Sequence, residues 1–161
     1  MSRPGLLPLH AAATFMMAGI VWFVQVDHYP LMARIGPAEF PAWEQAHRLI
    51  STLLMGPIMI LEAATGVALT RRPPPGVAPV AAWGGLVLIA LVWGSTAFIQ
   101  LPLHAALSRA FDAKTHASLV STNWIRTAGW SLRGLLVLWM LQSVPRSPTT
   151  VSLDVARPPD V

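Results

Sequence analysis

The chain has 161 residues, of which 54% are hydrophobic and only 11% are charged, whereas ordinary soluble domains carry about 25% charged residues. Its net charge of +4 comes from dispersed basic residues, which argues against a nucleic-acid-binding surface. The absence of cysteine excludes disulfides, thiolate metal sites and haem attached through C-x-x-C-H. The composition indicates an integral membrane protein.

The first apolar stretch covers residues 6–26 and is interrupted only by His10 and Gln25. It is longer than the apolar region of a secretory signal, and no small-x-small cleavage site follows it. We therefore expect a retained first membrane span. In the linker that follows, Pro37 and Pro41 should end any helix that continues from this span. A second helix is expected to begin after Pro41, outside the hydrocarbon, and to run into it.

Three further spans are expected over residues 49–70, 77–100 and 124–142, because a membrane-crossing helix needs about 20 apolar residues. Gly56-Pro57 should kink the second span, and Pro102 should end the third. Residues 103–123 form the second linker, whose pattern of apolar residues predicts a separate amphipathic helix near the membrane interface. Residues 144–161 form a proline-rich polar tail, which we expect to be disordered unless a partner holds it.

The predicted fold is therefore an all-α, polytopic four-helix membrane bundle. The strings F-V-Q (23–25) and F-I-Q (98–100) each precede a linker that carries two histidines and a carboxylate. This shared order predicts two pseudo-repeated helical pairs, although two unrelated interface linkers could also resemble each other by chance. Four spans place both termini on one side and both linkers on the other. The Arg71-Arg72 pair in the shortest loop favours cytoplasmic termini. We expect the protein in the inner membrane of a bacterium.

The two linkers supply a candidate metal site. Glu44 and His47 are three residues apart and share a helix face, a spacing that occurs in di-iron helical bundles. Asp112 and His116 are four apart and share a face in the same way. The set could hold iron, copper or zinc, or a tetrapyrrole such as haem or chlorophyll. The other interpretation is a group of interface histidines hydrogen-bonded to carboxylates and arginines. The candidate ligands are His28, Glu44, His47, His104, Asp112 and His116, and Gln25 and Gln100 could orient an imidazole.

A second candidate set lies within the predicted spans. Glu62 and Arg133 are expected roughly 20 Å and roughly 14 Å below the linker end of their spans, a difference that an arginine side chain can bridge. Ionisable groups in hydrocarbon require partners. We predict a Glu62–Arg133 pair with His10 nearby. The pair either fixes the rotation of the helices or belongs to a proton or quinone-headgroup site, in which case both residues bind a cofactor.

Four strings carry a resemblance to a known group of proteins: Q-V-D-H-Y-P-L (25–31), Q-L-P-L-H (100–104), F-D-A-K-T-H (111–116) and N-W-I-R-T (123–127). They resemble a small bacterial family of uncharacterised four-helix membrane proteins, over most of residues 15–140. The resemblance implies a four-helix polytopic protein and no particular activity.

Two functions of different classes follow from these observations. The first is an accessory subunit of a larger photosynthetic or respiratory electron-transfer complex, with the tail contacting other membrane subunits. The second is an intramembrane metal- or haem-dependent oxidoreductase built on the histidine–carboxylate set. No G-x-S-x-G, P-loop or dinucleotide motif is present. The sequence therefore gives no support to serine-nucleophile, phosphate-loop or dinucleotide-dependent chemistry.

Overall fold

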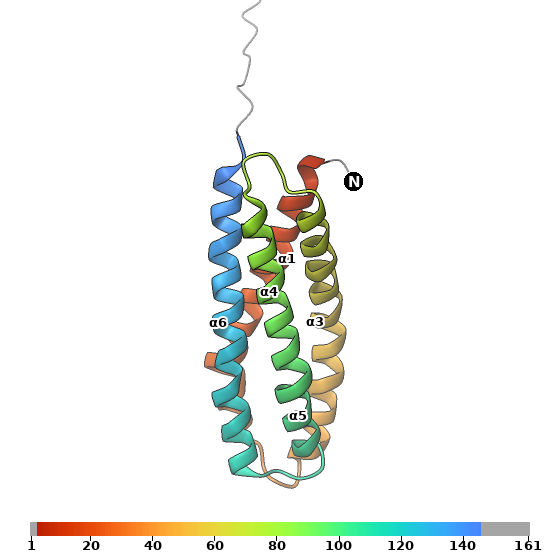
Figure 1. Cartoon of the computed structure of the whole chain (residues 1–161). Helices are drawn as coiled ribbons and strands as arrows, with labels where there is room; N and C mark the ends of the chain where they lie inside the picture. Colours follow the sequence, from red (N-terminus) through yellow and green to blue (C-terminus); the bar gives the residue numbers. More distant parts are fainter. Residues whose placement is uncertain (1–2, 146–161) are drawn as a thin grey trace, which may run out of the picture.

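The computed structural model describes residues 3–145, which form a bundle of four helical rods and contain no strand (Figure 1). The rods pack in the ring order first, second, third, fourth, each antiparallel to the next. The predicted all-α bundle is confirmed. The first rod consists of α1 (Arg3–Phe23), η1 (Val24–His28) and α2 (Tyr29–Met32), and the second is α3 (Phe40–Arg71). The third rod consists of α4 (Pro79–Ser95), η2 (Thr96–Gln100) and α5 (Leu101–Leu107), and the fourth is α6 (Ala113–Ser143).

The first and third rods each contain one wide, π-helical turn, η1 and η2. Each turn is closed by an i to i−5 hydrogen bond, from the Tyr29 N–H to the Val24 carbonyl and from the Leu101 N–H to the Thr96 carbonyl. A proline follows at once, Pro30 or Pro102, and cannot donate to the regular ladder. The expectation that Pro102 ends the third span was wrong, because the π-helical turn accommodates the proline and the helix continues to Leu107.

The second linker also differs from expectation. Residues 103–107 belong to α5, and residues 113–123 form the first turns of α6, so no separate interfacial helix exists between them. The Asp112 side chain caps α6 by accepting the Thr115 N–H at 2.7 Å, and no proline occurs between residues 113 and 143 to end the helix. The apolar side of this segment packs inward, where Leu107 and Leu119 are fully buried.

At the opposite end of the bundle, a short loop joins α3 to α4. Gly76 adopts φ +84°, the only positive φ among residues 3–145, which a glycine tolerates without strain. A Cβ at this position would meet the Ser143 carbonyl at the end of α6. The loop therefore packs against the end of α6, and both termini of the bundle lie at this end (Figure 1).

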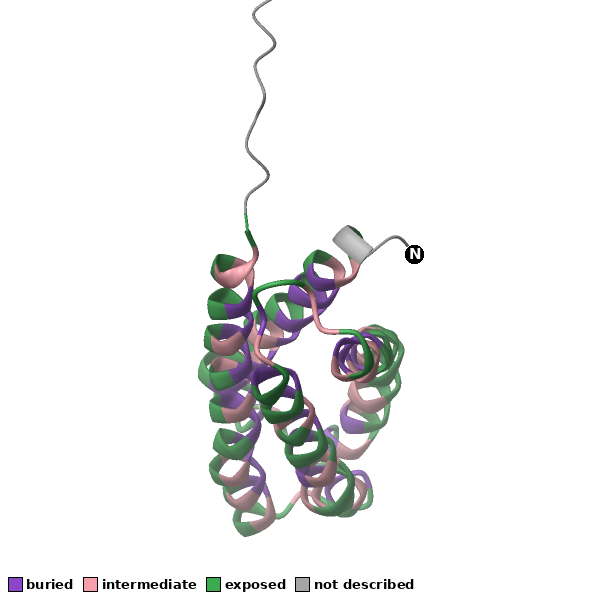
Figure 2. Cartoon of the chain, turned by 45° about the horizontal axis from the view of Figure 1, so that its top comes forward, coloured by how far each residue is buried: buried purple, intermediate pink, exposed green. Residues whose placement is uncertain are grey.

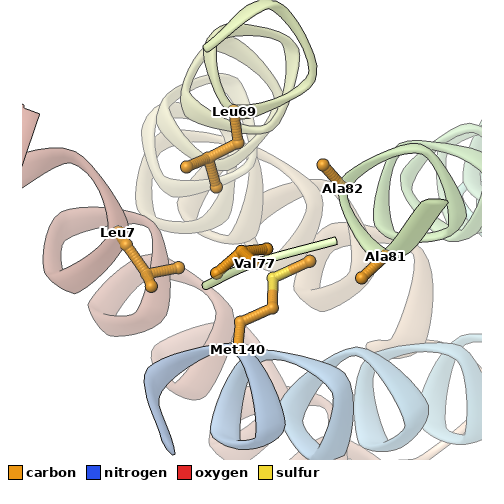
Figure 3. Close-up of a cluster of buried hydrophobic side chains, with 6 residues drawn as sticks. All are labelled: Leu7, Leu69, Val77, Ala81, Ala82 and Met140. Atoms are coloured by element: carbon orange, nitrogen blue, oxygen red, sulfur yellow. The ribbon is translucent and has the colours of Figure 1, made fainter. Parts of the chain in front are cut away.

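The core consists of three apolar layers stacked along the bundle. Figure 3 shows the layer nearest the termini, where side chains from all four rods and the α3–α4 loop point to one centre. Buried residues face the bundle axis and exposed residues face outward (Figure 2). Many of the outward residues are large and apolar, such as Leu53 at 68% and Phe98 at 83% exposure, as expected for a surface in contact with lipid.

Three of the rods are long and apolar enough to cross a membrane: Gly5–Met32, Phe40–Arg71 and Pro79–Leu107. These are the properties of a helical membrane protein. Helix α6 has 31 residues, about 45 Å at 1.5 Å per residue, and packs along α1 and α4. It is less apolar because it carries Asn123, Arg126 and Arg133, all of which are buried against its neighbours.

Candidate functional site

Two groups of buried polar side chains interrupt the apolar layers. The first, called here the Glu62 network, lies within the bundle and contains His10, Thr14, Glu62, Thr65, Trp130 and Arg133. The second, called the linker-end cluster, lies near the two linkers and contains His28, Tyr29, Glu44, His47, His104 and Arg126. The four linker histidines therefore gather at one end of the bundle, as the predicted topology requires.

The Glu62–Arg133 ion pair predicted from the sequence is present. The Arg133 Nη2 atom lies 2.8 Å from Glu62 Oε1, and both residues are at most 1% exposed. Glu62 also accepts hydrogen bonds from Thr14 at 2.8 Å and from the Trp130 indole at 3.0 Å. Arg133 donates to the Gly85 carbonyl on α4. The network thus ties all four rods together, and every buried polar atom of Glu62 and Arg133 has a partner.

His10 completes this network in a single tautomer. Its Nε2 lies 3.2 Å from Arg133 Nη2, and because a guanidinium only donates, Nε2 must accept. The proton is therefore assigned to Nδ1, which donates to Thr65 Oγ1 at 2.8 Å. The predicted proximity of His10 to the ion pair is confirmed, and the satisfied hydrogen bonding favours a structural role for the network.

In the linker-end cluster, three side chains form a buried hydrogen-bonded chain. His104 Nδ1 lies 2.5 Å from Glu44 Oε1, and the carboxylate is completely buried. His104 Nε2 lies 3.2 Å from the Tyr29 hydroxyl. Since a carboxylate oxygen accepts, the proton is assigned to Nδ1, and Nε2 is left to accept from the tyrosine. A tyrosine, a histidine and a glutamate in this order can pass a proton inward.

A second pair of imidazoles lies next to this chain. His28 Nε2 and His47 Nδ1 are 3.1 Å apart, and the His47 and His104 ring centroids are 5.4 Å apart. Trp43 stacks on His47 with an interplanar angle of 4° and so fixes its orientation. His28 and His47 are only partly buried, in contrast to His104.

The remaining candidate ligands lie apart from these pairs. His116 donates from Nε2 to the Tyr29 carbonyl at 3.1 Å, and Asp112 is exposed and caps α6. Hydrogen bonds from Thr115 lower the pKa of the Asp112 carboxyl. Among residues 3–145, no group of three or more histidine, aspartate and glutamate side chains is arranged to hold a metal ion. The metal and tetrapyrrole interpretations therefore remain predictions from the sequence.

Gln25 and Gln100 contact helices rather than imidazoles in the described part of the chain. Gln25 accepts from Asn123 at 2.9 Å and donates to the Val120 carbonyl of α6. Gln100 accepts from Ser95 at 2.9 Å and donates to Thr122. Because both glutamines lie in π-helical turns, they join those turns to α6 and fix their orientation in the bundle.

A cavity of about 600 Å³ adjoins the linker-end cluster, within the range of small-molecule sites in proteins. It lies among α1, α3, the α4–η2–α5 rod and α6. Most of its wall is apolar. Its polar end, as the term is used below, consists of four side chains of the linker-end cluster and the neighbouring Gln100: Tyr29, His47, His104, Arg126 and Gln100. Five other polar residues also line the cavity: Gln45, Arg48, Ser51, Thr52 and Thr96.

Two polar atoms of the linker-end cluster lack a hydrogen-bond partner, Glu44 Oε2 and Arg126 Nε. No other buried side-chain polar atom is unpartnered among the residues described. Arg126 is 5% exposed and lines the cavity. It donates to Asn123 at 3.1 Å and lies over the Trp130 ring, and no carboxylate lies within ion-pair distance of it in the described chain. Orphaned buried groups are rare and require an explanation.

The sequence analysis did not identify Tyr29 and Arg126 as site residues. Two signals were available, because Tyr29 is the only tyrosine and Arg126 falls inside the predicted fourth span. No family model, curated protein or solved structure matches the chain. The function must therefore be inferred from the geometry.

Proposed function

We propose that the protein binds a lipid-soluble molecule with an oxygen-bearing ring, of the quinone and hydroquinone class, in the linker-end cavity. The observation that supports this most directly is the unpartnered Nε atom of Arg126 in the wall of a mostly apolar cavity. Arg126 offers a buried positive charge to an electron-rich oxygen, and such a charge is expected to have a partner inside a membrane protein. The apolar wall suits a hydrocarbon body, and the polar end suits a ring that carries oxygens.

The chain from Tyr29 to Glu44 adds proton transfer to this binding. A hydroxyl of the ligand gives its proton to the Tyr29 oxygen while the Tyr29 proton moves to His104 Nε2. The imidazolium formed is stabilised by Glu44, whose oxygen lies 2.5 Å from His104 Nδ1. The ligand oxygen becomes anionic and faces the Arg126 guanidinium, which lines the same polar end of the cavity as Tyr29. The proton balance closes without any other reactant.

This proposal is related to both functions expected from the sequence. Molecules of this class carry electrons and protons within membranes, so either an electron-transfer subunit or an oxidoreductase could hold one. The proposed headgroup site is the linker-end cluster, whereas the sequence analysis had considered Glu62 and Arg133 for that role. The accessory-subunit function relied on the tail, and residues 146–161 lie outside the described part of the chain.

Binding can be tested with decylubiquinone in its oxidised and reduced forms, titrated into the purified protein in lipid nanodiscs. Tryptophans lie close to the cavity, with Trp93 in its wall and Trp130 under the Arg126 guanidinium, so we expect saturable quenching of tryptophan fluorescence. Arg126→Gln should weaken binding of the reduced form at least about tenfold, because a hydrogen bond to a charged group contributes about 1.5–3 kcal/mol. The matched control is Arg109→Gln, an exposed arginine near the same end. Quenching that does not saturate would refute the binding proposal.

Proton transfer can be tested separately with an alkyl nitrophenol, whose phenolate absorbs visible light. Binding to the wild type should increase the phenolate fraction at a fixed pH. His104→Gln and Tyr29→Phe should bind the probe with less phenolate, and their folding can be verified by circular dichroism. If both variants show the wild-type spectrum, the proposed proton chain is wrong, even if the cavity binds the probe.

A further inference from the structure

Part of the cavity wall is apolar and exposed. Four of the residues that line it are large, apolar and at the surface: Leu49 and Ile60 at 62%, Leu101 at 46% and Trp93 at 38% exposure. All four belong to segments apolar enough to cross a membrane. This part of the rim is therefore made of residues expected to contact lipid rather than water.

This opening lies between two irregular stretches of neighbouring rods. On α3, Gly56 lines the cavity and Pro57 follows it inside the helix. A Cβ built on Gly56 meets no heavy atom within 4 Å. Thr96 and Ala97 of η2 line the cavity too. Figure 1 shows that α3 and α4 run side by side, so a missing side chain on one rod and a wide turn in the next leave room between them.

We propose that this opening is a lateral portal to the lipid bilayer, and that the hydrocarbon tail of the bound ligand lies in it. The inference rests on the proposed function, since it takes the polar end of the cavity to hold the oxygen-bearing head. With the head beside Arg126, the apolar remainder of an amphiphile has a matching path to the lipid between Leu49, Ile60 and Leu101. Gly56 then determines specificity, because its lack of a side chain provides the space for the tail.

The test compares two probes that share one ring: decylubiquinone, and the same dimethoxy-methyl-benzoquinone ring without a tail. Gly56→Leu should weaken binding of the tailed probe at least about tenfold and change binding of the tail-less ring less than about threefold. Gly84→Leu is the matched control. Gly84 is a helical glycine in an apolar span, a Cβ there also meets nothing within 4 Å, and it does not line the cavity.

The outcomes separate the two proposals. If the wild type binds both probes and Gly56→Leu leaves both affinities unchanged, the portal is refuted and the binding site stands. Equal weakening of both probes would also refute the tail placement, because the new side chain would then be excluding the head. Failure of the wild type to bind either probe would refute the proposed function, and with it the portal.

Discussion

At the scale of single residues, the Glu62 network shows how a buried charge is accommodated. Arg133 is surrounded by acceptors from three other rods, namely Glu62, Thr14 and the Gly85 carbonyl. An ion pair in a low-dielectric interior is not by itself strongly stabilising, but removal of one partner leaves an uncompensated buried charge. The pair therefore specifies how the four helices are rotated relative to one another.

We expect Glu62→Gln or Arg133→Gln to destabilise the bundle by about 3–5 kcal/mol, measured as a fall in thermal midpoint in detergent. The double variant Glu62→Gln/Arg133→Gln should be less destabilised than the sum of the single variants, because neither charge is then left alone. Lys114→Gln provides a control at an exposed basic residue of the same helix. Additive effects in the double variant would show that the two side chains are not coupled.

At the scale of elements, the contact between α4 and α6 depends on a small residue. A Cβ added to Gly129 would collide with Cγ1 of Val92, which is 1% exposed and has a stiff, β-branched side chain. Small residues allow such close helix approach in membrane proteins. Gly129 therefore sets the distance between these two helices near the middle apolar layer.

Gly129→Ala should lower stability by about 1–3 kcal/mol, the usual cost of overpacking. Gly84→Ala, where the added methyl meets open space, should have no such effect and is the matched control. The measurement is the thermal midpoint of each variant in the same detergent. Equal midpoints for the two variants would contradict the close packing of α4 on α6.

The sequence predicted the long elements better than their irregularities. The Glu62–Arg133 pair could be anticipated because the constant helical rise converts residue number into depth. The π-helical turns could not, because Pro30 and Pro102 are compatible with either a helix end or a widened turn, and only packing decides. The same limit applies to the site: Arg126 resembles an ordinary basic residue near an interface until α6 is known to turn it inward toward Tyr29 and the cavity.

At the scale of the whole molecule, the ring of antiparallel rods fixes which segments share a side of the membrane. The 33–39 and 108–112 turns lie at one end, and the α3–α4 loop lies at the other (Figure 1). The assignment of the terminal end to the cytoplasm stays a prediction, as do the bacterial inner membrane and partner subunits. The 33–39 and 108–112 turns share one end of the bundle whichever way the protein is oriented in the membrane.

Topology can be tested by cysteine labelling, because the chain has no native cysteine. Single variants Gly36→Cys and Ala110→Cys should react with a membrane-impermeant maleimide from one side of sealed vesicles, and Pro74→Cys should react only from the other. The control is Leu53→Cys, on the lipid-facing side of α3, which should react from neither. Labelling of Gly36→Cys and Ala110→Cys from opposite sides would be incompatible with the bundle.

The polarity of α6 has a consequence for how the protein is made. Three earlier rods are apolar enough to cross a membrane by themselves, whereas α6 carries the buried Arg133, whose acceptors come from those rods. The ribosome synthesises α6 after the rods that carry these acceptors. Integration of α6 should therefore require that those rods are already in the bilayer. Newly made chains that lack the carboxylate of Glu62 should therefore insert the last helix more slowly, which exposes it for longer to quality-control proteases.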